Sequence, residues 1–240
     1  MEVDEYRRMA EVEDRHWWYR STRALLQQLL DGRLPNGGRF LDVGAGTGAT
    51  GAWLASKGTL IAADFEQLAL SLHLERHPDS EVVACDAASL PFPDASFDAV
   101  LCVTVLCHRS IDSPGTVVGE FARVIRPGGL LCLWEPGVRR LWRAHDRVTH
   151  TGRRFARRDL TTLMADNGLR VERATGAYSF LVPPAAAKTL LERGETSSDL
   201  DRNASGLGGV LPATAALERR ALRRIDLPAG LSVVAIGRRP

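Results

Sequence analysis

The fold of this chain is decided by the stretch Arg39-Phe40-Leu41-Asp42-Val43-Gly44-Ala45-Gly46-Thr47-Gly48-Ala49. Apolar residues before the first glycine predict a short strand that is buried on both faces of a parallel sheet. The three glycines allow a tight turn and let a ligand approach the backbone closely. A helix predicted over 50–56 would present unpaired N–H groups with partial positive charge at the turn. The stretch is typical of a site for a nucleoside-bearing cofactor with polar or negative groups.

Two cofactors fit these glycines. The pattern Gly44-x-Gly46-x-x-Ala49 satisfies the dinucleotide fingerprint, and Asp64 follows at about the expected distance of roughly 20 residues. The same stretch fits S-adenosylmethionine (SAM). Asp42 favours SAM, because its carboxylate would repel a pyrophosphate and attract the ammonium and sulfonium groups of SAM.

The composition indicates a globular protein with a substantial core. The chain has 240 residues, of which 45% are hydrophobic, so it forms one large domain or a core with a cap. Its formal net charge of +2 is too small to indicate nucleic acid as an obligatory partner. The N-terminus lacks the apolar core of a secretory signal, and no run approaches the roughly 20 apolar residues that span a bilayer. We therefore expect a cytoplasmic protein with no membrane partner.

The cysteines indicate reduced thiols rather than a metal site. None of the four is spaced as C-x-x-C, and no paired Cys and His ligands occur at the usual zinc spacing. We therefore expect no metal. The cysteines are Cys85, Cys102, Cys107 and Cys132.

The N-terminal segment carries three adjacent aromatic residues. Residues 4–30 are predicted to be helical, and Trp17, Trp18 and Tyr19 cannot all share one face of a helix. Some of these rings must face a second surface, which is a ligand cleft or a neighbouring chain, or they hold the segment on the core. Both interpretations stay open.

Strands and helices alternate after the glycine turn, which predicts right-handed crossovers and a largely parallel sheet. Strands are expected over 60–64, 81–86, 98–104 and 130–134, and helices over 66–76 and 113–126. Asp64 and Asp86 end two of these strands beside the turn. There Asp64 can accept hydrogen bonds from ribose hydroxyls, and Asp86 can accept from an adenine amino group while the Ala87 N–H donates to the ring.

The C-terminal part predicts an insertion into the sheet. A helix over 157–167 and a strand over 169–174 precede a stretch with helices near 185–192 and 213–224, and the last strand covers 231–237. About fifty residues between two strands are too many for a plain loop, so we expect a lid. The predicted organisation is an arm at 1–38, a core at 39–178, a lid at 179–228 and a final core strand at 229–240.

Four stretches together resemble the class I SAM-dependent methyltransferases. They are residues 41–48, Asp64, residues 86–98 and residues 123–129, and they occur in the family's order. The segment His16-Trp17-Trp18-Tyr19-Arg20 also resembles a bacterial subset of these enzymes, in which the arm folds over the cofactor cleft. The resemblance implies a Rossmann-like three-layer α/β sandwich with a helical cap. Its seven-stranded, mostly parallel sheet has a reversed last strand.

The resemblance also implies which residues bind SAM, whose product is S-adenosylhomocysteine (SAH). Asp42 and the glycine turn would hold the methionine end, Asp64 the ribose, and Asp86 with Ala87 the adenine, on which Phe65 would pack. Thr104, at the end of the fourth strand, stands where many relatives carry an acid. The expected cofactor-binding set is Asp42, Gly44, Ala45, Gly46, Gly48, Asp64, Phe65, Asp86, Ala87 and Thr104.

Methyl transfer from a sulfonium is an in-line displacement in which alignment at roughly 3–3.5 Å supplies much of the rate. A base is needed when the acceptor is a protonated amine, a hydroxyl or a carbon acid. His108, at the strand mouth, is the first candidate base, followed by His145 and His150. Candidate walls of the acceptor pocket are Tyr19, which is also a candidate catalytic residue, Trp17 and Tyr178. Glu135 is a candidate acceptor contact or strand cap.

The leading functional hypothesis is a methyltransferase acting on oxygen, nitrogen or carbon of a small molecule, as in specialised metabolism. Arginines between 139 and 158 form a solvated surface or a site for an acidic acceptor. The alternatives are an RNA or protein methyltransferase and a SAM-binding protein without transfer activity. Oligomeric state stays open.

Overall fold

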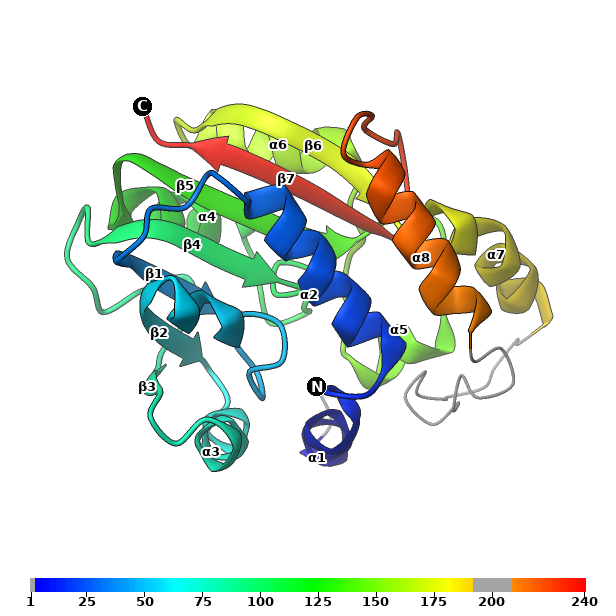
Figure 1. The fold of residues 1–240 in the computed structure, drawn as a ribbon, viewed down its shortest axis with the longest axis horizontal. Coiled ribbons are helices and arrows are strands. Elements are labelled where there is room, and N and C mark those ends of the chain that lie inside the picture. The colour runs from blue at the N-terminus through cyan, green and yellow to red at the C-terminus, as the bar shows by residue number, and fades with distance from the viewer. Residues whose placement is uncertain (1–2, 192–208) are drawn as a thin grey trace.

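A computed structural model describes residues 3–191 and 209–240. Seven strands form one sheet in the order β3-β2-β1-β4-β5-β7-β6, and β7 runs antiparallel to both of its neighbours (Figure 1). The predicted fold, including the reversed last strand, is confirmed. The strands are β1 (Gly38–Val43), β2 (Gly58–Asp64), β3 (Glu81–Ala84), β4 (Phe97–Val103), β5 (Ile125–Pro136), β6 (Arg170–Ala177) and β7 (Ser232–Arg238).

Helices cover both faces of the sheet. Figure 1 shows α2 and α8 side by side across one face, while α4 and α6 lie behind the other. In the described ranges, no helix has the length and apolar character to cross a bilayer. The helices are α1 (Val3–Val12), α2 (Trp17–Leu30), α3 (Gln67–Arg76), α4 (Pro114–Val124), α5 (Ala144–Val148), α6 (Arg157–Asp166), α7 (Val182–Leu191) and α8 (Val210–Ala221), with 3₁₀ turns η1 (Ala52–Ser56) and η2 (Ser179–Leu181).

Strand β1 is buried on both faces, as its apolar sequence predicts. Phe40 belongs to the core under α2 and α8, whereas Leu41 and Val43 belong to the core under α4 and α6. The parallel neighbours β2 and β4 pair with β1 on its two sides. The sheet therefore fixes the place at which β1 ends and the glycine turn begins.

The helix predicted over 50–56 is a short 3₁₀ turn over Ala52–Ser56. Two glycines and a β-branched threonine within residues 48–51 disfavour an α-helix there. The backbone of Gly51 instead packs against the carboxylate of Asp42, since a Cβ on Gly51 would lie 1.9 Å from Oδ2 of Asp42. The expectation of a helix N-terminus at this turn is therefore wrong.

Two other boundaries also differ from prediction. The segment 4–30 breaks between α1 and α2, where His16 is extended and its Nδ1 accepts the backbone N–H of Trp18 at 3.3 Å as a helix cap. Strand β3 ends at Ala84 rather than at Asp86, because Asp86 Oδ1 accepts the N–H of Ala88 at 2.8 Å and starts a turn.

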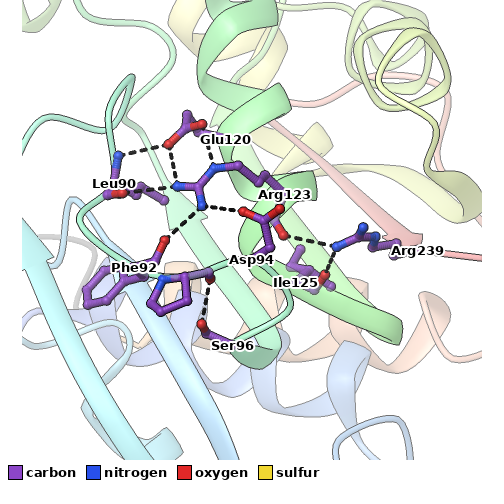
Figure 2. A network of polar contacts seen from close by, with 9 residues as sticks. Leu90, Phe92, Asp94, Ser96, Glu120, Arg123, Ile125 and Arg239 are labelled. Carbon is purple, nitrogen blue, oxygen red and sulfur yellow. Dashed lines mark hydrogen bonds and ion pairs between the residues drawn. The ribbon is translucent and has the colours of Figure 1, made fainter.

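Arg123 of α4 fixes the proline-rich loop that follows Asp86 (Figure 2). Its guanidinium donates to the carbonyl oxygens of Leu90 at 3.0 Å and Phe92 at 2.8 Å. It also pairs with Asp94 and Glu120, each at 2.8 Å. The clamp therefore holds the loop between the end of β3 and the start of β4.

Candidate functional site

The glycine turn is shaped by contacts that exclude side chains. Gly44, Gly46 and Gly48 all have positive φ, at 71°, 56° and 99°. A Cβ on Gly44 would lie 2.1 Å from a methyl carbon of Val105, so the turn and the loop after β4 approach closely. The N–H of Gly46 donates to Oδ2 of Asp64 at 2.9 Å. The ends of β1, β2 and β4 thus meet at this turn.

Asp42 is a buried carboxylate that faces a cavity. It is 2% exposed, and none of the described residues donates a hydrogen bond to its carboxylate. Burial, with a further effect from the charge of Asp64, raises the pKa of Asp42 to about 7. Such a group is satisfied when a cation binds, which is the chemistry of an ammonium or sulfonium ligand.

The cavity beside Asp42 has a volume of about 710 Å³. It extends from the glycine turn, past the carboxyl ends of β4 and β5, to α7 and the start of β7. The arm closes one side with residues of α1 and with His16, Trp17, Trp18 and Tyr19. Of the predicted site residues, its lining contains Tyr19, Asp42, Gly44, Ala45, Gly46, Thr104, His108 and His145.

The three adjacent aromatics of the arm line the cavity and also pack on the core. Trp18 lies against the ring of Tyr178, with centroids 4.1 Å apart, and Trp17 meets the same ring edge-on at 6.0 Å. The hydroxyl groups of Tyr178 and Thr22 are 2.8 Å apart. Tyr178 is 2% exposed and is not among the described lining residues. The two tryptophans that pack on Tyr178 therefore line the cavity, and Tyr178 itself does not.

Four residues predicted to hold the ribose and adenine lie outside the described lining of the cavity. Asp64 accepts N–H groups from Gly46 and Glu66, both at 2.9 Å. Burial raises the pKa of Asp64, and these N–H groups oppose that rise. Phe65 is 78% exposed. Asp86 is also exposed, and Ala87 is buried beside it. Helix α1 lies near Asp64, since burial first and then the charge of Asp64 raise the pKa of the Tyr6 hydroxyl.

Thr104 follows β4 with a φ of +57°, which is rare for a β-branched residue. Its N–H donates to the carbonyl oxygen of Trp134 at 2.7 Å, which helps to hold this backbone. Strain of this kind collects at functional sites. Thr104 lines the cavity where β4 ends, next to the glycine turn.

Glu135 positions the loop after β4. It is not one of the described residues that line the cavity. Its carboxylate accepts the N–H groups of Val105 at 3.2 Å, Leu106 at 2.9 Å and Cys107 at 3.1 Å. Burial raises the pKa of Glu135 to about 8, while the three N–H donors act in the opposite direction. Of the two predicted roles, the structure supports the strand cap.

The environment of His108 favours the neutral form of its ring. Burial, with a further effect from His150, lowers the pKa of His108 to about 4. A neutral imidazole accepts a hydrogen bond, but with this pKa it is a weak proton acceptor at pH 7. Burial raises the pKa of Tyr19, as do the charges of Glu13 and Glu5, so the Tyr19 hydroxyl stays protonated.

The end of the cavity opposite the turn carries several basic side chains. Arg143, His145, Arg154 and Lys188 line it together with one carboxylate, Asp146. That carboxylate is buried and already bound, since Arg154 pairs with it at 2.7 Å and the N–H of Arg143 donates to it at 2.6 Å. Among described residues, no group of three His, Cys, Asp or Glu side chains is placed to hold a metal ion.

Comparison with known proteins shows what the central part of the chain is similar to. Residues 41–133 match the family model described as a methyltransferase domain. The predicted resemblance to the class I SAM-dependent methyltransferases is therefore confirmed. A demethylmenaquinone methyltransferase from Renibacterium salmoninarum is 41% identical over 100 residues, which are 41% of this chain and 41% of the relative. The chain spans less than half the length of this relative and of a second one, from Beutenbergia cavernae.

Solved structures share the fold of this chain. A SAM-dependent methyltransferase from Thermotoga maritima superposes with a TM-score of 0.61 at 21% identity and covers 99% of this chain and 96% of its own. The [4+2]-cyclase SpnF superposes with a TM-score of 0.59 at 24% identity, covering 90% of this chain and 80% of its own. At these identities the likeness shows the fold alone.

Sequence reasoning missed several residues of the site. Glu5 and Glu13 line the cavity from the arm, and Trp134 and Lys188 line its far end. Arg143 also lies there, and it belongs to the arginine-rich segment 139–158 for which an acidic-acceptor site was one of the predictions. The two glutamates carry no local signal, because their place depends on how α1 packs against the turn. Trp134 could have been found, since it ends a predicted strand at the edge of the sheet where ligands bind.

Proposed function

We propose that this domain binds SAM on its glycine turn and transfers the methyl group to a small molecule in the adjoining cavity. The buried Asp42 carboxylate carries the proposal, because it faces a cavity of about 710 Å³ and accepts no hydrogen bond from the described residues. Bound SAM would supply an electrophilic methyl group. Asp42 would hold its ammonium group, Asp64 the ribose hydroxyls, and Asp86 with Ala87 the adenine, beside Phe65.

The cavity favours an acceptor with an apolar body and an acidic group. Trp17, Trp134 and Leu231 provide apolar surface, and Arg143 and Lys188 lie at the far end. A guanidinium or ammonium group there would attract a carboxylate, phenolate or enolate. The one carboxylate in this wall is bound by Arg154 and is poorly placed to receive an amine. A relative is named for demethylmenaquinone, which is likewise a small molecule.

Alignment, rather than strong base catalysis, would account for the rate. The arm and α7 enclose the acceptor, and Thr104 lies where the turn meets the acceptor end. His108 would accept a hydrogen bond from the acceptor hydroxyl and orient its oxygen toward the methyl group. An acidic hydroxyl needs no strong base, which fits the low pKa of His108. His145 would contact the acceptor from the far end, and the protonated Tyr19 would form a wall.

The arm at 1–38 and the lid at 179–228 would together cover the site. Residues of α1, α7 and α8 line the cavity, which supports this division, although residues 192–208 of the predicted lid lie outside the described residues. All four cysteines are free. Free thiols are typical of a reducing compartment, and this supports the cytoplasm as the proposed location.

A second candidate is a SAM-binding protein with a different activity or none. The fold is shared with a [4+2]-cyclase, so the fold alone does not fix the reaction. The two candidates differ in whether SAH accumulates when an acceptor is present.

Calorimetric titration with SAM and with NADH tests the cofactor. We expect heat from SAM and none from NADH, and tight NADH binding without SAM heat would overturn the proposal. SAH release is then measured with a panel of phenols, carboxylic acids and amines. Turnover of phenols or acids over amines supports the proposed acceptor class, whereas SAM binding without turnover of any acceptor favours the second candidate.

A further inference from the structure

The arm is attached to the glycine turn through a buried carboxylate that the proposed reaction does not use. The Thr47 hydroxyl donates to Oε2 of Glu13 at 2.6 Å. Both residues are almost fully buried, with exposures of 0% for Thr47 and 1% for Glu13. Thr47 lies between the second and third glycines of the turn, and Glu13 follows α1 directly. The contact therefore joins the glycine turn to the end of α1.

Arg76, the last residue of α3, joins this contact to α3. Its Nε lies 3.0 Å from Oε1 of Glu13, and its Nη2 lies 2.6 Å from Oδ2 of Asp14. Its Nη1 also donates to the carbonyl oxygen of Ala10. One side chain of α3 thus binds the C-terminal end of α1 at three points. Since α3 packs on β2 and β3, the arm is tied to the sheet as well as to the turn.

The arm covers the proposed cofactor site. Met9 lies over the turn, with its methyl carbon 3.8 Å from where a Cβ of Gly46 would stand. Glu5, Met9 and Glu13 line the cavity together with Asp42. A ligand bound between Asp42 and the turn would therefore lie beneath α1, so movement of α1 would open a path for its exchange with solvent.

We propose that Glu13 is a positioning residue that clamps α1 onto the glycine turn through Thr47 and Arg76, and that this clamp sets the rate at which the cofactor leaves. The inference rests on the proposed function, because the ligand beneath the arm is taken to be SAM or SAH. It assigns Glu13 no part in the chemical step. Weakening the clamp should therefore speed ligand release without a comparable loss in the methyl-transfer step.

The test measures the dissociation rate of SAH from the full chain by stopped-flow fluorescence. Thr47→Val removes the hydroxyl, and Glu13→Gln keeps an acceptor for Thr47 but removes the ion pair with Arg76. Each should speed SAH release by about tenfold, because hydrogen bonds to charged groups are the stronger ones. Thr47→Ser should restore the slower release. Asp4→Asn is the matched control, since Asp4 pairs with Arg7 on the exposed side of α1 and should leave release unchanged.

Hydrogen exchange of the α1 amides without ligand gives a second readout that does not depend on SAH. Exchange should be faster in Thr47→Val and Glu13→Gln than in wild type and Asp4→Asn, with β1 and β4 unchanged. Wild-type protein that binds no SAH would overturn the proposed function and this inference together. Wild-type protein that binds SAH, with release and α1 exchange in both clamp variants equal to wild type, would overturn this inference alone.

Discussion

The carboxylate of Asp64 accepts the backbone N–H of Gly46 at 2.9 Å, so the end of β2 holds the turn that follows β1. Its other oxygen accepts the N–H of Glu66 at 2.9 Å. The side chain predicted to bind a ribose is thus also a support of the glycine turn. Substitution of Asp64 should therefore affect both the ligand contact and the shape of the turn.

Asp64→Ala is expected to weaken SAM binding by about 1 kcal/mol or more, because the ribose hydroxyls and the Gly46 N–H lose a charged acceptor. Calorimetric titration measures the change. Asp79→Asn, at an exposed position before β3, is the matched control and should bind as wild type. Unchanged SAM affinity in Asp64→Ala would remove this residue from the site.

SAM affinity should rise with pH as Asp42 ionises. The pKa of Asp42 is about 7 without ligand, and a bound ammonium group would lower it. Binding below pH 7 should therefore release a proton from this carboxyl, and affinity should level off above about pH 8. Titration in two buffers with different ionisation enthalpies measures the proton release. Asp42→Asn should bind SAM more weakly and lose this pH dependence, and a pH dependence equal to wild type would contradict the assignment.

The same carboxyl should lower stability without ligand as pH rises. Its folded-state pKa of about 7 lies above the ordinary value of 3.8 for an aspartate, so the folded protein binds the proton more tightly than the unfolded chain. The contribution of Asp42 to the free energy of unfolding is therefore fully present below about pH 4 and is lost as pH rises through 7. Urea unfolding measures the free energy of unfolding of wild type and of Asp42→Asn across this range. The value for wild type minus the value for Asp42→Asn should fall as the pH rises from about 4 to above 7.

His108→Ala should reduce turnover by about tenfold and change SAM affinity little, because the ring faces the acceptor end. With a pKa of about 4, His108 should produce no inflection in the rate between pH 6 and 8. His108→Gln keeps a hydrogen-bond acceptor and should retain more activity than the alanine variant. Equal turnover in wild type and His108→Ala would exclude this residue from the reaction.

Glu135→Ala is expected to lower the free energy of unfolding by about 3 kcal/mol or more, because two buried N–H groups and one partly buried N–H group after β4 lose their acceptor. Chemical denaturation measures this change. Glu75→Ala, at an exposed position of α3, serves as the control and should change stability by less than about 0.5 kcal/mol. A comparable small change for Glu135→Ala would show that the loop does not depend on this carboxylate.

The sheet half of the structure could be predicted because its signals are local. The apolar run before Gly44 identifies β1, and Asp64 marks the end of β2 directly. The helix predicted over 50–56 failed because the packing of Gly51 on Asp42 involves residues nine positions apart, which propensity does not report.

The far half of the site could not be predicted, because it is assembled by long-range packing. The contact between Glu13 and Thr47 spans 34 residues. The low pKa of His108 depends on burial by surrounding segments, and its sequence position alone indicates a group that titrates near neutral pH. Tyr178 was predicted to line the cavity, but Trp17 and Trp18 of α2 pack on its ring and line the cavity instead. This arrangement also depends on how α2 packs on the core.

A crystal structure of the full chain with SAH tests the central claim most directly. The account predicts SAH on the glycine turn beneath α1, with its ammonium nitrogen about 3 Å from the Asp42 carboxylate, its ribose at Asp64 and its sulfur directed toward Thr104. SAH bound elsewhere, or lying in the cavity with its ammonium group away from Asp42, would contradict the account.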